Sequence, residues 1–370
     1  HLCGPKHDFE WSLRGDMRHF LGVGDLWVIA GQSNSAGYGK GPYCDPPELG
    51  VHLLDNALRW RLATQPLNES TDTAHVANTE AANPGHGPWL HFGRLLLQQT
   101  CVPVGLVQVS LGGSALSRWN PAEDGDSGLH ELMVETVRYC GGRVRGILWY
   151  QGETDGNPEQ GETYLERFEA AVAAWREALG DPALPVLTVQ LNRSQGPSSA
   201  GSDRGWSLVR EAQRQAARRD ENIAVVPAID CGMSDHVHND PQGNMVLAQR
   251  TADAARAIAW GLDVDWKAPD VAGARRTKGD AVIELTFENV RYRLANNDNA
   301  AVAFRVEDEQ GEVGVRKVQH TGDEHLRLHL DRPLEGSAVV HGAWGADPPR
   351  APYDDVRHMP ILGFADLPVE

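Results

Sequence analysis

The sequence predicts a three-layer α/β/α domain built on a parallel sheet, followed by a small antiparallel β-domain. Short apolar runs alternate with helix-like stretches over the first two thirds of the chain. This alternation is typical of a parallel sheet that is covered by helices on both faces. After about residue 265 the helical spacing stops and short strands with alternating side chains begin. The 370 residues are enough for both domains.

Five apolar runs are expected to form the parallel strands, and four stretches with helical spacing are expected to cover them. The expected strands are Leu26–Ala30, Val104–Ser110, Gly146–Tyr150, Val186–Leu191 and Ile223–Pro227. The expected helices lie near Trp89–Leu96, Tyr164–Leu179, Arg204–Asp220 and Pro241–Trp260. Active sites in such sheets lie at the carboxyl ends of the strands, so residues that directly follow a strand are the first candidates for function.

A long segment, Tyr38–Pro88, separates the first two expected strands and is rich in Gly, Pro, Asn, Asp and Thr. It is far longer than a usual strand-to-helix connection. We expect a lid or a substrate wall, with a short helix around Leu53–Leu62. A surface insertion without a role is the alternative.

The composition shift near Asp265 divides the chain into three parts. Residues 1–24 are expected to be an N-terminal extension, residues 25–264 the catalytic domain, and residues 265–370 a small β-sandwich-like domain. His325–Leu330 alternates strictly between apolar and polar side chains, as a half-buried strand does. The β-domain is expected either to bind carbohydrate or to brace the catalytic domain.

Hydrophobic residues make up 41% of the chain and charged residues 23%, which is ordinary for a soluble globular protein. The formal net charge of −17 argues against nucleic acid as a partner, since phosphate binding needs a basic surface. An anionic sugar would need a local arginine cluster. No apolar run approaches the ~18–20 residues of a membrane span.

The five cysteines are spread along the chain without a C-x-x-C pair, so a structural zinc site is not expected. One or two disulfides and buried free thiols both remain possible. The chain begins at His1, so the lack of a signal peptide does not settle the compartment, although a secreted or periplasmic location is favoured over a cytoplasmic one. The oligomeric state is open.

A nucleophile and its base are indicated by two short motifs. Gly31-Gln32-Ser33-Asn34 follows the first expected strand, where a tight turn can expose the serine hydroxyl. Asp235 precedes His238 by three residues, close enough to accept the Nδ1 proton and leave Nε2 facing Ser33. His236 and Asp230, which could suggest a metal pair or a second orienting acid, are interpreted as structural.

Donors for an oxyanion are expected beside the serine. The candidates are the backbone N–H of Ser33, a backbone N–H from Gly112 or Gly113, and the side-chain amide of Gln151. Glu153 has two possible roles. It is expected to support the site, by tying down the loop Gly112–Ser114, rather than to act as a second acceptor for the histidine.

These motifs resemble the SGNH-type hydrolases, and within them the group of sialate O-acetylesterases and related carbohydrate acetylesterases. Gly31–Asn34, Trp149–Glu153 and Asp235–His238 match three blocks of this group, and Leu111–Ser114 with Trp119 and Pro121 matches the remaining one. The resemblance covers roughly Gly24–Trp260. It implies an SGNH-hydrolase-like (flavodoxin-like) fold, assigns the nucleophile, orienting acid and base to Ser33, Asp235 and His238, and implies no cofactor or metal. Ser35 stands where the group usually has methionine, which would slightly widen the acyl pocket.

The expected function is that of a serine esterase that removes O-acetyl groups from carbohydrates, like a sialate O-acetylesterase or an acetylxylan esterase. The alternatives are a broad-specificity short-chain carboxylesterase and a catalytically inactive carbohydrate-binding homologue. Within the long segment, Trp60, His86 and Trp89 are candidates for a sugar cleft, although Trp89 fits a helix core better.

Overall fold

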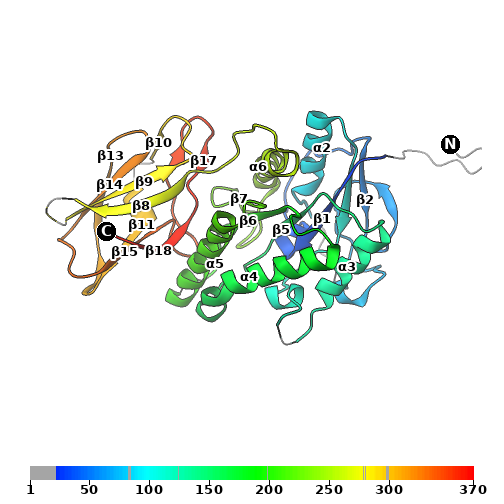
Figure 1. Cartoon of the computed structure of the whole chain (residues 1–370), viewed down its shortest axis with the longest axis horizontal. Helices are drawn as coiled ribbons and strands as arrows, with labels where there is room; N and C mark the ends of the chain where they lie inside the picture. The colour runs from blue at the N-terminus through cyan, green and yellow to red at the C-terminus, as the bar shows by residue number, and fades with distance from the viewer. Residues whose placement is uncertain are drawn as a thin grey trace, which may run out of the picture.

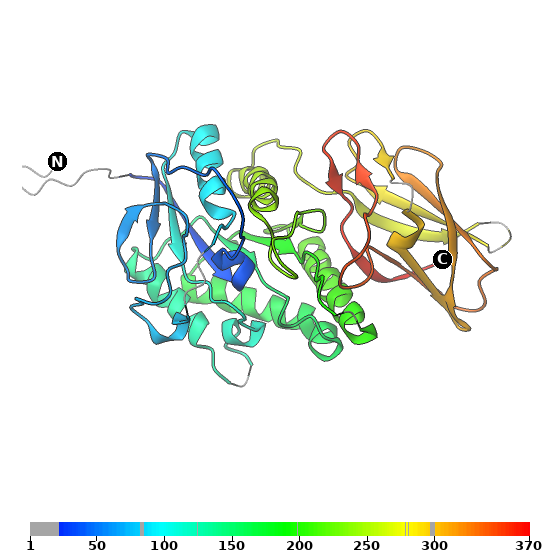
Figure 2. The same ribbon diagram turned by 180° about the vertical axis from the view of Figure 1, so that it is seen from behind.

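The computed structural model describes residues 22–81, 85–123, 125–197, 199–277, 279, 281–296 and 300–370. These residues form an α/β lobe and an antiparallel lobe that lie side by side along the long axis of the molecule (Figure 1). The view from behind shows the same two lobes, with the last strands of the chain lying next to the α/β lobe (Figure 2). Most of the expected N-terminal extension, residues 1–21, lies outside the described residues.

The α/β lobe contains a seven-stranded sheet in the order β3-β2-β4-β1-β5-β6-β7. Its neighbouring strands are parallel except for the antiparallel pair of β2 and β3. The strands are β1 (Asp25–Gly31), β2 (Val51–Leu54), β3 (Trp60–Leu62), β4 (Val104–Gln108), β5 (Gly146–Tyr150), β6 (Val186–Gln190) and β7 (Ile223–Pro227). The five expected strands are present as β1, β4, β5, β6 and β7.

The order of these five strands creates a switch point beside β1. The chain moves from β1 to β4 on one side, then crosses to β5 on the other and continues outward to β7. This is the 2-1-3-4-5 order of flavodoxin-like sheets, in which ligands bind at the carboxyl ends of the strands where the order reverses. The ends of β1, β4 and β5 therefore meet at the place where a site is expected.

Helices cover both faces of the sheet, and each face has its own apolar core. The helices α2 (Trp89–Thr100) and α6 (Pro241–Trp260) pack on one face, around Trp27, Trp89 and Phe92. The helices α3 (Gly128–Tyr139), α4 (Pro158–Leu179) and α5 (Ala200–Arg219) pack on the other, around Trp119, Trp149 and Trp175. Short helical turns complete the lobe: α1 (Ser33–Ala36), η1 (Val76–Asn78) and η2 (Leu116–Trp119). The sequence predicted α2, α4, α5 and α6 but not α3.

The segment 38–88 does not contain the expected helix near Leu53–Leu62. Those residues instead form β2 and β3, which extend the sheet beyond β4. A turn held by the carboxylate of Asp55, which accepts hydrogen bonds from the backbone of Ala57 and Arg59, joins the two strands. The helix prediction was wrong because pairing with β4 decides the backbone of this short apolar run.

The second lobe consists of antiparallel sheets that share one apolar core, around Phe287, Leu328 and Phe364. Two sheets have four strands each, in the orders β13-β14-β9-β8 and β12-β11-β15-β18, and β10-β16-β17 form a smaller one. The elements are β8 (Asp270–Arg276), β9 (Val282–Glu288), β10 (Leu294–Ala295), η3 (Ala300–Ala303), β11 (Phe304–Asp308), β12 (Gly311–Val313), β13 (Val315–His320), β14 (His325–Leu330), β15 (Ala338–Gly342), β16 (Tyr353–Asp354), β17 (Met359–Pro360) and β18 (Phe364–Pro368). The expected antiparallel β-domain is therefore present.

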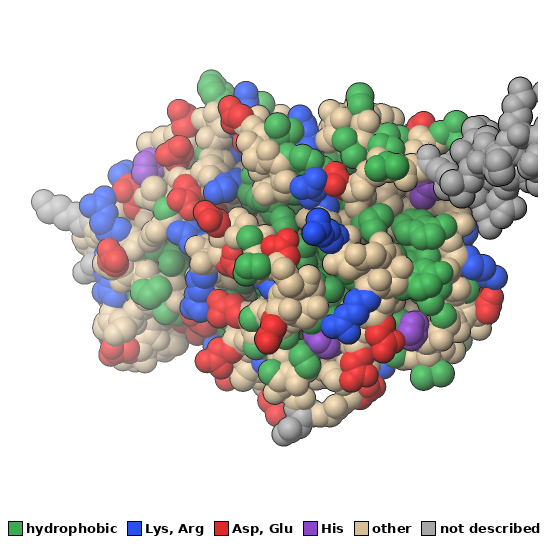
Figure 3. Space-filling model, turned by 45° about the vertical axis from the view of Figure 1, so that its right-hand side comes forward, with side chains coloured by type: hydrophobic (Ala, Val, Ile, Leu, Met, Phe, Trp, Pro, Cys, Tyr) green, Lys and Arg blue, Asp and Glu red, His purple; other side chains and the backbone are tan. Residues whose placement is uncertain are grey.

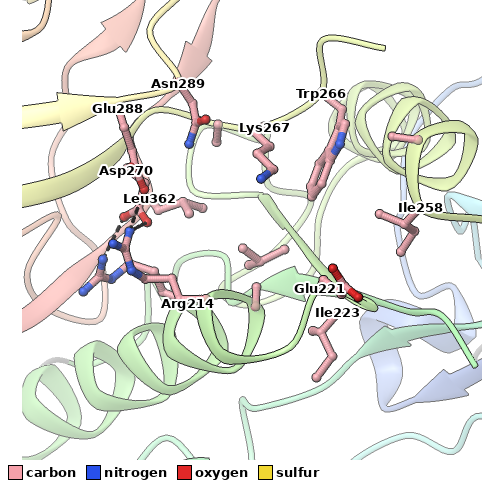
Figure 4. Close-up of a pocket in the computed structure, with 15 residues that line it drawn as sticks. Arg214, Glu221, Ile223, Ile258, Trp266, Lys267, Asp270, Glu288, Asn289 and Leu362 are labelled. Atoms are coloured by element: carbon pink, nitrogen blue, oxygen red, sulfur yellow. Dashed lines mark hydrogen bonds and ion pairs between the residues drawn. The ribbon is translucent and has the colours of Figure 1, made fainter. Parts of the chain in front are cut away.

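The two lobes are joined by hydrogen bonds and ion pairs from helix α5. Arg214 of α5 forms an ion pair of 2.8 Å with Asp270 at the start of β8. This pair lies at one side of a cavity of about 470 Å³ between the lobes, which Trp266 and Lys267 of the connecting segment also line (Figure 4). The cavity reaches Ile223, the first residue of β7, so it lies at the amino end of that strand rather than at the carboxyl ends.

Acidic and basic side chains are interspersed on the face of the molecule in Figure 3. None of the helices in the described ranges is long and apolar enough to cross a membrane. The cysteines of the described ranges, Cys44, Cys101, Cys140 and Cys231, are free, and Cys3 lies outside those ranges.

Candidate active site

The nucleophile motif forms a sharp turn at the carboxyl end of β1. Gly31 has φ of +116°, and a Cβ atom there would lie 2.2 Å from the backbone oxygen of Tyr150 in the neighbouring strand β5. Only glycine fits this turn. Ser33 follows as the first residue of the short helix α1, with 8% of its surface exposed. The turn thus presents the serine hydroxyl at the switch point of the sheet.

The structure brings Ser33, His238 and Asp235 together in the hydrogen-bonded arrangement of a catalytic triad. His238 Nε2 lies 2.9 Å from Ser33 Oγ, and His238 Nδ1 lies 2.8 Å from Asp235 Oδ2. The other oxygen of Asp235 accepts the backbone N–H groups of Val237 and His238, both at 2.9 Å. The carboxylate therefore fixes both the backbone of its own turn and the ring of the histidine.

Asp235 is ionised at neutral pH, because its pKa lies far below 7. Partial burial opposes the charged form, but the hydrogen bonds from the His238 ring and from the backbone N–H groups of Val237 and His238 outweigh it. Together they lower the pKa of Asp235 to about 2. An ionised acceptor at Nδ1 places the proton of the neutral imidazole on that nitrogen and leaves Nε2 free to accept a proton from the serine.

Three asparagines hold the loop that carries His238. Asn34 and Asn192 both donate their side-chain amides to the backbone oxygen of Val237, each at 3.0 Å. Asn34 Oδ1 accepts the backbone N–H of Asn239 at 3.0 Å, and Asn192 Nδ2 reaches Asn239 Oδ1 at 2.8 Å. The residues on both sides of His238 are therefore held by side chains that come just after β1 and just after β6. Asn34 belongs to the nucleophile motif, but no local signal in the sequence identified Asn192 or Asn239.

The loop Leu111–Ser114 lies beside the serine. Ser114 Oγ donates to the backbone oxygen of Leu111 at 2.9 Å, and Thr154 Oγ1 donates to the backbone oxygen of Gly113 at 3.2 Å. Within the described chain, the backbone N–H groups of Ser33 and Gly113 have no hydrogen-bond acceptor, whereas the N–H of Gly112 lies 3.4 Å from the carboxylate of Glu80. Ser33 and Gly113 thus have free donors for an oxyanion.

The geometry does not support the predicted oxyanion role of the Gln151 side chain. Gln151 is completely buried, and its amide nitrogen lies 2.6 Å from Asp155 Oδ2 and 3.2 Å from Gln32 Oε1. Its amide oxygen accepts the hydroxyl hydrogen of Tyr164 at 2.7 Å. Both N–H bonds of the amide are already used inside the protein. Gln151 therefore anchors the end of β5 to α4 and to the nucleophile turn.

Glu153 supports the site, but not by the route predicted from the sequence. Its Oε1 accepts the Asn34 amide at 2.7 Å, and the loop Gly112–Ser114 is held by Thr154 and Ser114 instead. Burial raises the pKa of Glu153 to about 7, against the lowering effect of the Asn34 hydrogen bond. Glu153 thus acts on the histidine loop through Asn34.

Several other predicted residues lie away from the serine. Trp89 is fully buried and donates its indole N–H to Ser35. Ser35 is therefore part of the core beside Trp89 and does not widen an acyl pocket, contrary to the expectation from the sequence. His86 is buried against Asp45, and Trp60 lies on the edge strand β3, so neither forms the expected sugar cleft.

Asp230 and His236 take no part in the catalytic hydrogen bonds described above. Asp230 pairs with Arg250. His236 is exposed, and its backbone oxygen accepts the N–H of Gln195 at 2.7 Å.

Two residues of the segment 38–88 reach the site without any signal in the sequence. The ring of Tyr38 lies 5.2 Å from the ring of His238, measured between centroids. Glu80 reaches Gly112, as described above. The segment therefore does form a wall of the site, through residues other than the predicted ones. Among the described residues, no group of three or more His, Cys, Asp and Glu side chains could hold a metal ion.

A serine at the end of the first strand of a 2-1-3-4-5 sheet, hydrogen-bonded in series to a histidine and an aspartate, defines a serine hydrolase of the SGNH type. Within that class, the sequence identifies one family. Residues 23–257 match the family described as carbohydrate esterase, sialic acid-specific acetylesterase, and the chain belongs to this family. The protein is therefore a carboxylic ester hydrolase of the carbohydrate esterase family.

Individual relatives agree with this assignment. The chain is 29% identical over 253 residues to a probable carbohydrate esterase from Arabidopsis thaliana, a match that covers 62% of this chain and 89% of the plant protein. It is 24% identical over 291 residues to human sialate O-acetylesterase, covering 66% of this chain but only 55% of the human protein. A carbohydrate acetylesterase from Xanthomonas citri has the same fold, with a TM-score of 0.73 and 23% identity over 93% of this chain and 80% of its own.

Proposed function

We propose that this protein removes acetyl groups from sugar hydroxyls, with Ser33 as nucleophile, His238 as general base and acid, and Asp235 as the group that orients His238. The observation that carries the proposal is the series of hydrogen bonds from Ser33 Oγ through His238 to Asp235, at 2.9 Å and 2.8 Å. Membership in the carbohydrate esterase family supports an acetylated carbohydrate as substrate.

The proposed reaction has two halves. Ser33 Oγ attacks the carbonyl carbon of the acetyl ester while its proton moves to His238 Nε2, and the N–H groups of Ser33 and Gly113 bind the oxyanion. The carbon–oxygen bond to the sugar then breaks, and His238 gives the proton to the departing sugar oxygen. A water molecule, deprotonated by His238, attacks the acetyl-enzyme. Acetate leaves and Ser33 recovers its proton.

The test is to replace Ser33 with alanine and to measure acetate release from acetylated sugars and from a small aryl acetate. Activity on both should be lost, while the melting temperature stays close to that of the wild type, since among the described residues the Ser33 hydroxyl bonds only to His238 and its removal takes a single oxygen atom from the turn. A Ser33→Ala variant that retains more than a few per cent of wild-type turnover would disprove the assigned nucleophile.

Chain-length preference separates this proposal from the broad carboxylesterase. A carbohydrate acetylesterase should prefer acetyl to octanoyl esters of the same alcohol, because each added methylene of the acyl group needs space beside Ser33. Preference for the octanoyl ester would favour the carboxylesterase.

A further inference from the structure

Glu80 brings a carboxylate from the segment 38–88 to the edge of the active site. Its Oε1 accepts hydrogen bonds from Asn68 Nδ2 at 3.2 Å and from Ser70 Oγ at 3.4 Å. The same oxygen accepts the backbone N–H of Gly112 at 3.4 Å. Two neighbours on its own segment thus hold the side chain, and it makes a long hydrogen bond to the loop beside the nucleophile.

Tyr38 connects this carboxylate to the catalytic histidine. A Cβ atom on Gly112 would lie 2.6 Å from Glu80 Oε2 and 2.7 Å from the Tyr38 hydroxyl oxygen, so both groups pack directly on Gly112. The Tyr38 ring packs on His238, as described above. Burial raises the pKa of Tyr38 above its usual range, and so do the hydrogen bond from its hydroxyl to Glu80 and the charge of Glu80, so the hydroxyl keeps its proton. Tyr38 therefore contacts both Gly112 and His238, and Glu80 contacts Gly112 in the loop beside the nucleophile.

The carboxylate of Glu80 has no ion-pair partner among the described residues. The arginines closest to it in the sequence pair with aspartates instead: Arg59 with Asp72, Arg61 with Asp55, Arg94 with Asp45 and Arg118 with Asp126. The carboxylate therefore gives this side of the site a negative charge.

A carboxylate in this position favours one kind of substrate. Ionised oxygens are strong acceptors for hydroxyl groups, and a sugar carries free hydroxyls next to its acetylated oxygen. The same charge repels a sugar that carries its own carboxylate, and little screening by solvent is expected inside a partly covered site.

We propose that Glu80 binds a free hydroxyl of a neutral acetylated sugar and discriminates against acidic sugars such as O-acetylated sialic acids. The proposal rests on the function proposed above, and it narrows the substrate class to uncharged, hydroxyl-rich glycans. The Tyr38 hydroxyl packs on Gly112 beside the carboxylate of Glu80 and bonds to it, so it helps to hold Glu80 in place.

The experiment compares two substrates on the same enzyme. The neutral substrate is an O-acetylated methyl xyloside, the acidic one is 9-O-acetylated N-acetylneuraminic acid, and each kcat/KM is divided by that for a small aryl acetate. The wild type should prefer the neutral sugar. Glu80→Gln keeps an oxygen for Asn68 and Ser70 but removes the charge, so the preference should fall by about 10-fold or more.

Glu69→Gln is the matched control, because it removes one negative charge from the same segment. The Glu69 carboxylate bonds to Thr71 and has no contact with Gly112, so the substrate preference should remain within about 2-fold of the wild type.

A second variant tests the site if Glu80→Gln does not fold. Tyr38→Phe keeps the ring that packs on His238 and removes only the hydroxyl beside Glu80. KM for the neutral sugar should rise several-fold, with a smaller change in kcat.

Two results would overturn the inference. The first is a wild-type enzyme that prefers the acidic sugar, and the second is a folded Glu80→Gln variant with unchanged preference. Both leave the proposed esterase function standing if Ser33→Ala abolishes turnover of the aryl acetate. Failure of the enzyme to release acetate from any sugar would instead refute the proposed function, and the inference with it.

Discussion

Replacement of Arg210 by methionine is expected to loosen the junction between the two lobes and to disturb the catalytic loop. Arg210 lies on α5 with 1% of its surface exposed. Its guanidinium donates to backbone oxygens on both sides of the junction. The acceptors are Leu191 and Asn192, which directly follow β6, and Ala343, Gly345 and Ala346 in the β-domain.

The magnitude follows from two opposing contributions. Hydrogen bonds to a charged group stabilise by about 1.5–3 kcal/mol each, which for the acceptors of Arg210 amounts to at least about 8 kcal/mol. Burial lowers the pKa of Arg210 from 12.5 to about 9, and this corresponds to a cost of about 5 kcal/mol for keeping the guanidinium charged. About 3 kcal/mol remains. Because methionine also leaves buried carbonyls without donors, the expected loss of unfolding free energy is about 3–5 kcal/mol.

An effect on activity is expected as well, because Asn192 links Arg210 to the catalytic loop. Arg210 holds the backbone oxygen of Asn192, and the Asn192 amide holds Val237 and Asn239 on either side of His238. A displacement of about 1 Å at a catalytic group can cost about 100-fold in rate. We expect kcat on a small aryl acetate to fall about 10- to 100-fold.

Urea unfolding followed by tryptophan fluorescence measures the stability, and initial rates on the aryl acetate measure kcat. Arg204→Met is the matched control, since Arg204 is on the same helix and reaches the same β-domain through an exposed ion pair with Asp366. Exposed pairs contribute about 0–1 kcal/mol, so this variant should resemble the wild type. If Arg210→Met loses no more stability than Arg204→Met and keeps its kcat, the proposed role of Arg210 is refuted.

Two further predictions concern the carboxylates of the site. Asp235→Asn should lower kcat by about 10³- to 10⁴-fold, the size of effect known for this change in other Ser-His-Asp enzymes, whereas Asp230→Asn, which loses only the pair with Arg250, should keep most of its turnover. Burial raises the pKa of Glu153 from 4.5 to about 7. Between pH 4.5 and 7, Glu153 is therefore protonated in the folded state but ionised in the unfolded state. Unfolding free energy should therefore fall as pH rises from about 4.5 to 7, by up to about 3 kcal/mol relative to Glu153→Gln. Parallel pH profiles of the two proteins would contradict this reasoning.

The parts of the fold that the sequence predicted well are those with the strongest local pattern. A parallel strand buried on both faces needs an unbroken apolar run, so β5 and β7 have the predicted boundaries. The long helices α4 and α6 repeat their apolar positions over several turns. The short strand β2 has no such signal, because its four residues fit either period and only the neighbouring β4 selects the strand.

The orientation of Gln151 could not be predicted for a different reason. The residue follows β5, where a side chain can turn toward the substrate or toward the covering helix. Asp155 and Tyr164 draw the amide inward, and both contacts depend on the packing of α4 against the end of the strand. Neither partner has a spacing that marks it as a ligand of Gln151 in the sequence. The motif indicated that the residue matters, but not which way it faces.

The pair Asp235–His238 and the contact between Glu80 and Gly112 differ in the sequence separation of the residues that they bring together. Asp235 and His238 are three residues apart, so a single turn brings them together, and the sequence is enough to pair them. Glu80 meets Gly112 only because Asn68, Ser70 and the pairing of β2 with β4 determine the path of a long segment across the sheet. The pairing of Asp235 with His238 can therefore be predicted from the sequence alone, whereas the substrate selection that we propose for Glu80 depends on the tertiary packing of the segment 38–88. If the proposal for Glu80 holds, changes within that segment will alter which sugar is accepted, while the hydrogen bonds from Ser33 through His238 to Asp235 keep their geometry.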